Sequence, residues 1–175
     1  MNDSNVVGKS VHRVDALNKA TGQADYAADM ELPGMLYARI KRSPLPHARI
    51  LNIDTQRAGR IAGVKAVLTA REVNLPRYGR IIKDKQVFAA DKVRYVGDPV
   101  AAICATDLDT VEEALDLIEV EYEELPAVFD PISAITPDAP VIHEELESYE
   151  AIYPYIRSGN ICAHMQVVNG NVEKG

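Results

Sequence analysis

The stretch from Val100 to Glu124 constrains the fold most, because three hydrophobic patterns follow one another within it. Residues 100–105 form an unbroken apolar run, which is typical of a strand inside a sheet. Residues 109–118, with Asp109 as the predicted N-cap, carry one apolar helical stripe made of Val111, Ala114, Leu115 and Ile118. Residues 119–123 then alternate strictly, which predicts a strand with its glutamates facing solvent. Together the three patterns predict a packed domain that contains both helices and strands.

The segments before Val100 are shorter and are divided by prolines and glycines. Period-two alternation predicts strands over residues 35–41 and 47–53, separated by the proline-containing segment 43–46. A third strand is expected over 64–68, and an exposed loop over 74–84. Short helices are predicted from Asp15 to Gly22 and from Asp54 to Ile61. We therefore expect an α+β fold, with a mixed sheet and a few short helices on one side.

The two ends of the chain have weaker patterns. Residues 1–10 are predicted to be a flexible N-terminal arm, followed by the folded domain over 11–135. Residues 136–175 are expected to be irregular, because prolines break them into short pieces. Within this part, a strand is predicted over 161–168, and the turn at 169–171 predicts a hairpin.

Composition excludes several classes of function. The 175 residues suffice for one domain with a real core, and 26 acidic against 19 basic residues give a net charge of −7. An acidic chain is not attracted to phosphate backbones, so nucleic-acid binding is disfavoured. The N-terminus has no signal-peptide pattern, and no apolar run is long enough to span a membrane. The two cysteines match no metal or disulfide pattern, so a cytoplasmic location is expected.

The sequence contains no residue pattern that marks a catalytic, cofactor-binding or metal-binding site. The alternating glutamates at 119, 121 and 123 are interpreted as a solvated strand face rather than an acid–base pair or cation site. His143-Glu144-Glu145 lacks a second histidine at helical spacing and is interpreted as a surface turn. Glycine-rich phosphate loops and nucleophile-elbow motifs are also missing from the sequence.

One local group of cations is a candidate contact surface. Arg42, His47 and Arg49, with Arg39 nearby, surround a proline-rich segment that we expect to be exposed. Cations of this kind can bind an anion or the acidic surface of another subunit. A subunit contact is the favoured interpretation of these three residues.

Several phrases occur in an order that resembles the large, molybdenum-binding subunit of the xanthine dehydrogenase and aldehyde oxidase family. They are Val7-Gly8-Lys9-Ser10, Arg13-Val14-Asp15-Ala16, Ala20-Thr21-Gly22-Gln23-Ala24-Asp25-Tyr26, Leu32-Pro33-Gly34-Met35-Leu36, Arg42-Ser43-Pro44, Arg94-Tyr95-Val96-Gly97-Asp98-Pro99-Val100-Ala101-Ala102 and Leu125-Pro126-Ala127-Val128. The resemblance runs from Val7 to about Val172. It implies the N-terminal α/β-hammerhead domain of that large polypeptide.

The resemblance also implies cofactors and partners. The full enzyme would hydroxylate or reduce a carbon centre with a molybdopterin cofactor, and iron–sulfur clusters and FAD would lie on partner domains or subunits. The family's catalytic glutamate and pterin-binding loops lie in later domains, so none of them corresponds to a residue here. We therefore expect this chain to bind no cofactor and to be inactive alone, with residues 136–175 beginning the cofactor-binding domain as a cut or naturally split subunit.

Two other functions are considered beside this one. The chain could be a free-standing protein-binding or assembly module, which would have no gene for cofactor domains beside it. It could also be a self-contained hydrolase or metalloenzyme, although the sequence contains no site for either reaction. The scaffolding domain of a molybdenum hydroxylase is the favoured prediction.

Overall fold

The computed structural model describes residues 7–153, 156–171 and 173–174. The chain divides into two units, 1–35 and 36–175. The described part of the first unit contains helix α1 (Ala16–Ala20) and the 3-10 turn η1 (Ala27–Asp29), and none of its described residues is buried. Asp15 precedes α1 as predicted, but its carboxylate pairs with Lys19 and Arg13, each at 2.6 Å, instead of capping the helix. Residues 1–6 of the predicted arm lie outside the described residues.

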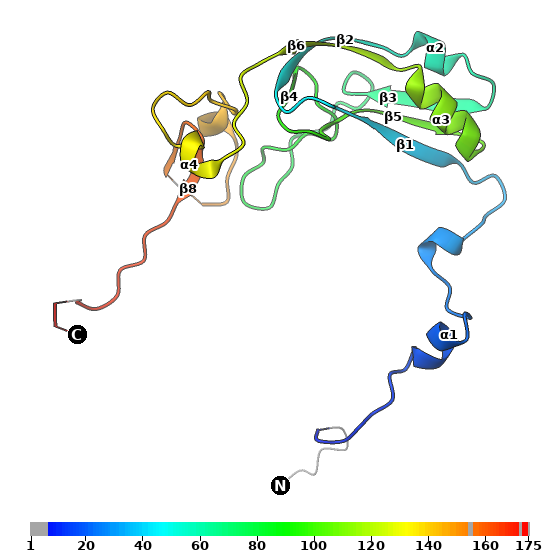
Figure 1. Cartoon of the computed structure of the whole chain (residues 1–175), viewed down its shortest axis with the longest axis horizontal. Coiled ribbons are helices and arrows are strands. Elements are labelled where there is room, and N and C mark those ends of the chain that lie inside the picture. Colours follow the sequence, from blue (N-terminus) through cyan, green and yellow to red (C-terminus); the bar gives the residue numbers. More distant parts are fainter. Residues whose placement is uncertain (1–6, 154–155, 172, 175) are drawn as a thin grey trace. The chain divides into compact units, whose positions relative to one another are not determined.

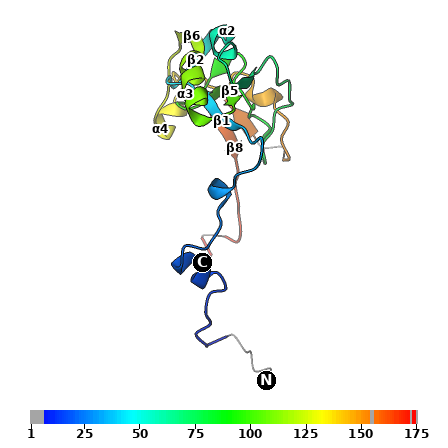
Figure 2. The ribbon, with the colours of Figure 1, turned by 90° about the vertical axis from the view of Figure 1, so that its right-hand side faces the viewer.

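The second unit is built around a three-stranded antiparallel sheet in the order β1-β5-β3 (Figure 1). Its strands are β1 (Tyr37–Arg42), β3 (Val64–Thr69) and, between them, β5 (Pro99–Ala105). The apolar run at 100–105 therefore lies in the central strand, as the sequence predicts. Helix α2 (Gln56–Gly59) and helix α3 (Leu108–Asp116) pack on one face of this sheet (Figures 1 and 2).

The core lies between α3 and this sheet. Ile103 and Ala105 of β5 meet Val111 and Ala114 of α3, and Ile118 completes the same buried cluster. Residues at matching register positions share a face, so Tyr37 and Val64 extend this cluster on either side of Ala105. The helical stripe predicted from the sequence is the side of α3 that this core buries.

Helix α3 begins earlier than predicted. Asp107, not Asp109, is the N-cap, and its carboxylate accepts a hydrogen bond from the Thr110 backbone N–H at 2.8 Å. The hydroxyls of Thr106 and Thr110 donate to the same carboxylate. These hydrogen bonds, with those from Thr110 the strongest, hold the pKa of Asp107 below its ordinary value. Asp107 thus makes the capping hydrogen bond that the sequence pattern assigned to Asp109.

A second antiparallel sheet has the order β4-β2-β6. It consists of β2 (Ala48–Asp54), β4 (Lys92–Val93) and β6 (Glu119–Glu124). The α+β prediction is confirmed, but the strands form small antiparallel sheets instead of one mixed sheet. Paired strands in these two three-stranded sheets are not consecutive in the sequence, so local sequence patterns do not reveal which strands pair.

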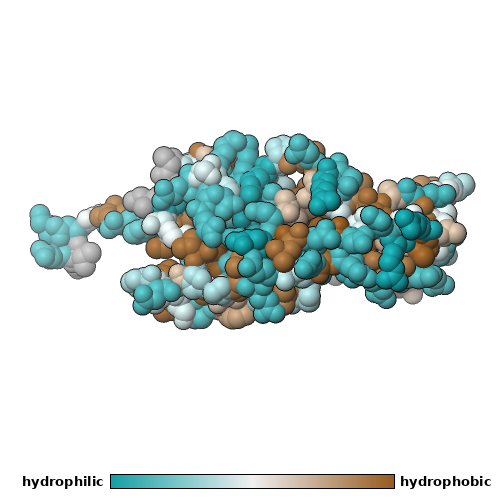
Figure 3. All heavy atoms as spheres, turned by 90° about the horizontal axis from the view of Figure 1, so that it is seen from above, coloured by the Kyte–Doolittle hydropathy of each residue, from teal (hydrophilic) through white to brown (hydrophobic). Residues whose placement is uncertain are grey.

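The predicted alternation of β6 is confirmed. Val120 and Tyr122 are half-buried, whereas the glutamates of the strand are exposed. Arg57 and Arg49 form exposed ion pairs with Glu119 and Glu123. The view in Figure 3, taken from the side on which β2, β6 and α2 lie in Figure 1, is mostly hydrophilic.

The region after residue 125 contains only short helices and strands, joined by irregular segments. The short elements are α4 (Pro131–Ala134), the 3-10 turn η2 (Leu146–Ser148), β7 (Ile156–Ser158) and β8 (Ile161–His164). Strand β8 pairs with the preceding strand β7 through a turn at Gly159, so the observed hairpin is not the one predicted at 169–171. Asn160 holds this region together, because its amide nitrogen donates to the carbonyls of Ala134 and Pro140.

Candidate functional site

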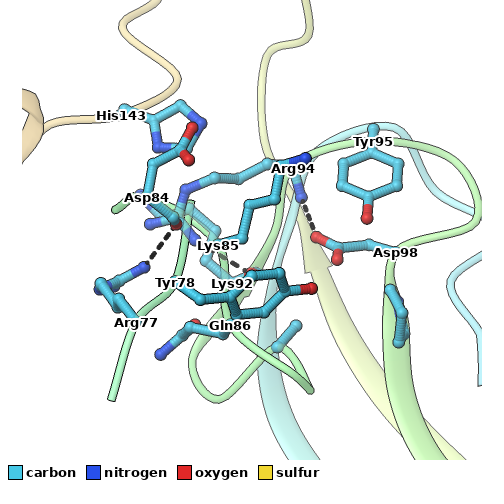
Figure 4. A pocket seen from close by; sticks show the side chains of 12 residues that line it. Arg77, Tyr78, Asp84, Lys85, Gln86, Lys92, Arg94, Tyr95, Asp98 and His143 are labelled. Carbon is cyan, nitrogen blue, oxygen red and sulfur yellow. Dashed lines mark hydrogen bonds between the residues drawn. The ribbon is translucent and has the colours of Figure 1, made fainter. Parts of the chain in front are cut away.

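The main candidate site is a pocket of about 400 Å³ in the second unit. It lies between the loop that follows β3, the turn between β4 and β5, and His143 (Figure 4). The polar and aromatic side chains that line it are Arg77, Tyr78, Asp84, Lys85, Gln86, Lys92, Arg94, Tyr95, Asp98 and His143. The pocket is therefore richer in cations than the acidic chain as a whole.

The loop on one side of the pocket is closed by backbone hydrogen bonds. Tyr78 and Lys85 exchange two of them, at 2.9 and 3.0 Å. Gly79 permits this closure, because a Cβ atom there would lie 1.8 Å from the carbonyl oxygen of Ile82. The Lys83 N–H donates to the carbonyl of Glu150, which fixes the loop to a segment distant in the sequence.

The opposite wall is the turn that connects β4 to β5. The Arg94 backbone N–H donates to the Asp98 carboxylate at 3.0 Å, and Gly97 takes a φ of +93° to complete the turn. The turn is anchored to Ser43, which accepts from the Gly97 N–H and donates its own N–H to the Asp98 carbonyl. Burial raises the pKa of Asp98 above its ordinary value, even though hydrogen bonds from the Arg94 backbone N–H and the Tyr95 side chain favour the charged form.

Two arginines that line the pocket share the carboxylate of Glu145, which lies outside the pocket lining. Its Oε1 accepts from Arg94 Nη2 at 2.8 Å and from Arg77 Nη2 at 3.3 Å. The Arg77 guanidinium lies 4.9 Å from the centre of the Tyr149 ring, a cation–π distance. Burial of Tyr149, together with its hydrogen bond to Glu145, raises the pKa of Tyr149 to about 12. Burial also raises the pKa of Glu145, but hydrogen bonds and the two arginines outweigh it and lower that pKa overall.

His143 does not lie on an open surface turn as predicted. It is half-buried, and its Nδ1 lies 3.2 Å from the Tyr149 hydroxyl. Burial, followed by the charge of Arg94, lowers the pKa of His143 and so favours its neutral form. Among the described residues, no group of three or more His, Cys, Asp or Glu side chains is placed to hold a metal ion.

The three predicted contact residues have different environments. Arg42 is exposed and donates to the Gly97 carbonyl at 2.9 Å, and Arg49 is exposed beside Glu123. His47 is only 4% exposed, and its Nδ1 lies 2.6 Å from the carbonyl oxygen of Pro126. The proline-rich segment is therefore folded inward at His47, and only the two arginines can reach another molecule. A subunit contact at Arg42 and Arg49 stays a prediction.

The sequence did not single out Arg77, Arg94, Glu145 or Tyr149 as members of one cluster. The ion pairs of Glu145 join residues that are 51 and 68 positions apart. The signal that was present is the Arg94–Asp98 turn, which is rich in polar and aromatic residues. Nothing in the local spacing indicates that this turn meets the 143–149 segment.

None of the helices in the described residues is long and apolar enough to cross a membrane. Cys104 is half-buried and Cys162 is exposed, and both are free thiols.

Comparison with known proteins places the fold. Residues 21–126 match the family model described as the a/b hammerhead domain of aldehyde oxidase and xanthine dehydrogenase. The solved structure of reconstituted CO dehydrogenase from Oligotropha carboxidovorans superposes with a TM-score of 0.72 at 38% identity, over 79% of this chain and 18% of that chain. The aldehyde oxidoreductase from Desulfovibrio gigas gives a TM-score of 0.69 at 31% identity, over 75% and 16%.

Two curated relatives are similar along most of this chain. A probable xanthine dehydrogenase subunit from Bacillus subtilis (strain 168) is 40% identical over 164 residues, or 93% of this chain and 20% of that protein. The nicotinate dehydrogenase large molybdopterin subunit from Eubacterium barkeri is 44% identical over 149 residues, or 85% and 35%. The chain thus spans a fifth to about a third of the length of these relatives. The predicted α/β-hammerhead fold is confirmed, and the chain belongs to the aldehyde oxidase and xanthine dehydrogenase family.

Proposed function

We propose that this chain is the structural hammerhead portion of a molybdopterin-dependent oxidoreductase that hydroxylates or reduces a carbon centre. The observation that carries the proposal is the hammerhead match over residues 21–126, in a chain that spans only part of its dehydrogenase relatives. The ion pairs of Glu145 with Arg77 and Arg94 support a structural role, because they join segments that are distant in the sequence.

The chain spans a fifth to about a third of the length of its relatives, one of which is named a molybdopterin subunit. We therefore assign the cofactor to other parts of the enzyme, and iron–sulfur clusters and FAD to partner domains or subunits. The chain alone would be inactive, and its free thiols agree with a cytoplasmic enzyme.

An uncovered face of the first sheet supports docking to the rest of such an enzyme. Ile40 and Leu68 lie on either side of Ala102, at matching register positions on the face opposite α3. They are 42% and 39% exposed, and Cys104 continues the same apolar face. Apolar surface of this kind is suited to contact with another domain. Arg42 and Arg49 provide charge at positions exposed to solvent.

The test is assembly of the enzyme with the cofactor-bearing polypeptides encoded in the source genome. Replacing Arg42 and Arg49 together with Glu is expected to reduce co-purification and to shift sedimentation toward smaller species. The matched control is Arg57→Glu, because Arg57 is also exposed and also pairs with one glutamate of β6. Equal assembly of the double variant and the control would reject the contact. Dehydrogenase activity of the purified chain without those polypeptides would reject the structural role.

A further inference from the structure

We propose that the pocket lined by Arg77, Lys85, Lys92 and Arg94 binds a small oxyanion, a phosphate or carboxylate group. This site goes beyond the proposed function and does not depend on it. The first observation is the local charge, since four cations and two carboxylates line the pocket, whereas the whole chain has more acidic than basic residues. An isolated excess of cations in an acidic protein is a feature that attracts anions.

The second observation is an unused buried donor. The Arg94 side chain is 8% exposed, and its Nε–H has no hydrogen-bond partner among the described residues. Its Nη2 donates to Glu145 and its Nη1 to the Lys92 carbonyl, so the guanidinium is held in place while Nε stays unsatisfied. A buried donor without a partner is costly, and native proteins usually satisfy one with water or a bound ion. Arg94 itself lines the pocket (Figure 4).

The third observation is that the neighbouring cations are only weakly neutralised. Lys92 is also 8% exposed, but its partner at 3.1 Å is Glu144, which is 70% exposed to solvent. An ion pair with so exposed a carboxylate is weak, because water competes for it. Lys85 is exposed at the rim and has no ion pair with any residue that the structure describes. An oxyanion in the pocket would meet one buried guanidinium and two available ammonium groups.

Two carboxylates determine how tightly the anion binds. Asp84 and Asp98 both line the pocket, and their negative charge opposes an anion. Asp98 also accepts a backbone hydrogen bond that forms the turn, so it is a poor site for substitution. Asp84 uses its backbone carbonyl, not its carboxylate, to hold Arg77. Asp84→Asn is therefore a variant that should strengthen binding and leave the loop intact.

The experiment is a titration of the 175-residue chain with inorganic phosphate and, separately, with acetate, followed by amide chemical shifts. Ionic strength is kept constant with NaCl. Saturable shifts are expected at the backbone amides of Tyr78, Lys85 and Lys92. The response to phosphate or acetate then identifies which oxyanion the site prefers. Asp84→Asn should bind roughly threefold to tenfold more tightly, since it removes one like charge from the pocket.

Two further variants complete the test. Lys85→Gln should weaken binding by a similar factor, whereas Lys65→Gln, an exposed lysine of β3 away from the pocket, should leave it unchanged. A damaged fold would weaken binding and could not strengthen it. The affinity of Asp84→Asn for the anion is therefore the measurement that decides whether the site exists. Shifts that do not saturate, shifts spread evenly over surface lysines, or an unchanged affinity in Asp84→Asn would each overturn the proposal.

Discussion

The Glu145 carboxylate is expected to be the polar group on which the stability of the pocket depends most. It is one anion shared by Arg94 and Arg77, and the Arg94 side chain is 8% exposed. Breaking a buried ion pair from one side costs about 3–5 kcal/mol, because the partner charge stays buried. Glu145 is itself 34% exposed, and a glutamine can still accept one hydrogen bond. Glu145→Gln should therefore lower the free energy of unfolding by roughly 2 kcal/mol, which is below the range for a fully buried pair.

The assay is urea unfolding at neutral pH, with Glu147→Gln as the matched control. The control removes an exposed carboxylate of the same segment that has no ion pair with any described residue, so its effect should stay within roughly 0.5 kcal/mol. With a denaturant slope of about 2 kcal/mol/M, the Glu145→Gln midpoint should fall by about 1 M. Equal midpoints for the two variants would show that the buried arginines do not need this carboxylate, and the reasoning would be refuted.

The pH dependence provides an independent check of the same ion pairs. The folded-state pKa of Glu145 is lowered below its ordinary value of 4.5. A lowered folded pKa contributes stability that is fully present above the unfolded pKa and is lost as the pH falls through the folded pKa. The difference between wild type and Glu145→Gln should therefore be largest near neutral pH and should decline below about pH 4.5. A difference that stays constant into acid would indicate lost packing instead of lost charge.

Three further predictions concern the scaffold. Ile103→Ala, at a position 1% exposed in the core beneath α3, should cost about 2–5 kcal/mol in urea unfolding, and a cost below about 1 kcal/mol would mean that the site collapses. Gly63→Ala should lower the melting temperature more than Gly97→Ala, because both have positive φ but only at Gly63 would a Cβ lie 2.9 Å from a Thr106 oxygen. Asp107→Ala should destabilise α3, and since the pKa of Asp107 is lowered, circular dichroism melts should show this difference shrinking as the pH falls below 3.8.

Local patterns were sufficient for those parts of the fold that depend on near neighbours in the sequence. The stripe of α3, the alternation of β6 and the apolar run of β5 each follow from a single periodicity, and all three elements are present. The N-cap was placed two residues late, because Asp107 and Asp109 both satisfy a capping pattern. The choice depends on the hydroxyl groups of Thr106 and Thr110, which bond Asp107.

Features that depend on distant pairing were not predictable from one sequence. His47 was expected at the surface because prolines surround it. In the structure its ring contacts the carbonyl of Pro126, which is 79 positions away in the sequence. The candidate pocket also depends on distant pairing, because two of its arginines, Arg77 and Arg94, form ion pairs with Glu145, which is far away in the sequence. A single sequence has no periodicity that encodes such contacts, and only the polar Arg94–Asp98 turn indicated where they would form.

The order of the strands has a consequence for synthesis on the ribosome. Strand β1 pairs with β5, where Tyr37 lies opposite Ala105, and β2 pairs with β6, where Asp54 lies opposite Glu119. The amino-terminal strands of both sheets therefore emerge long before these partners and must wait until residues up to 124 have left the exit tunnel. During that interval Tyr37 and Ile50, which are partly buried against the two core clusters in the folded chain, stay uncovered. Nascent chains arrested before Glu119 should bind general chaperones, and those arrested well beyond Glu124 should resist protease.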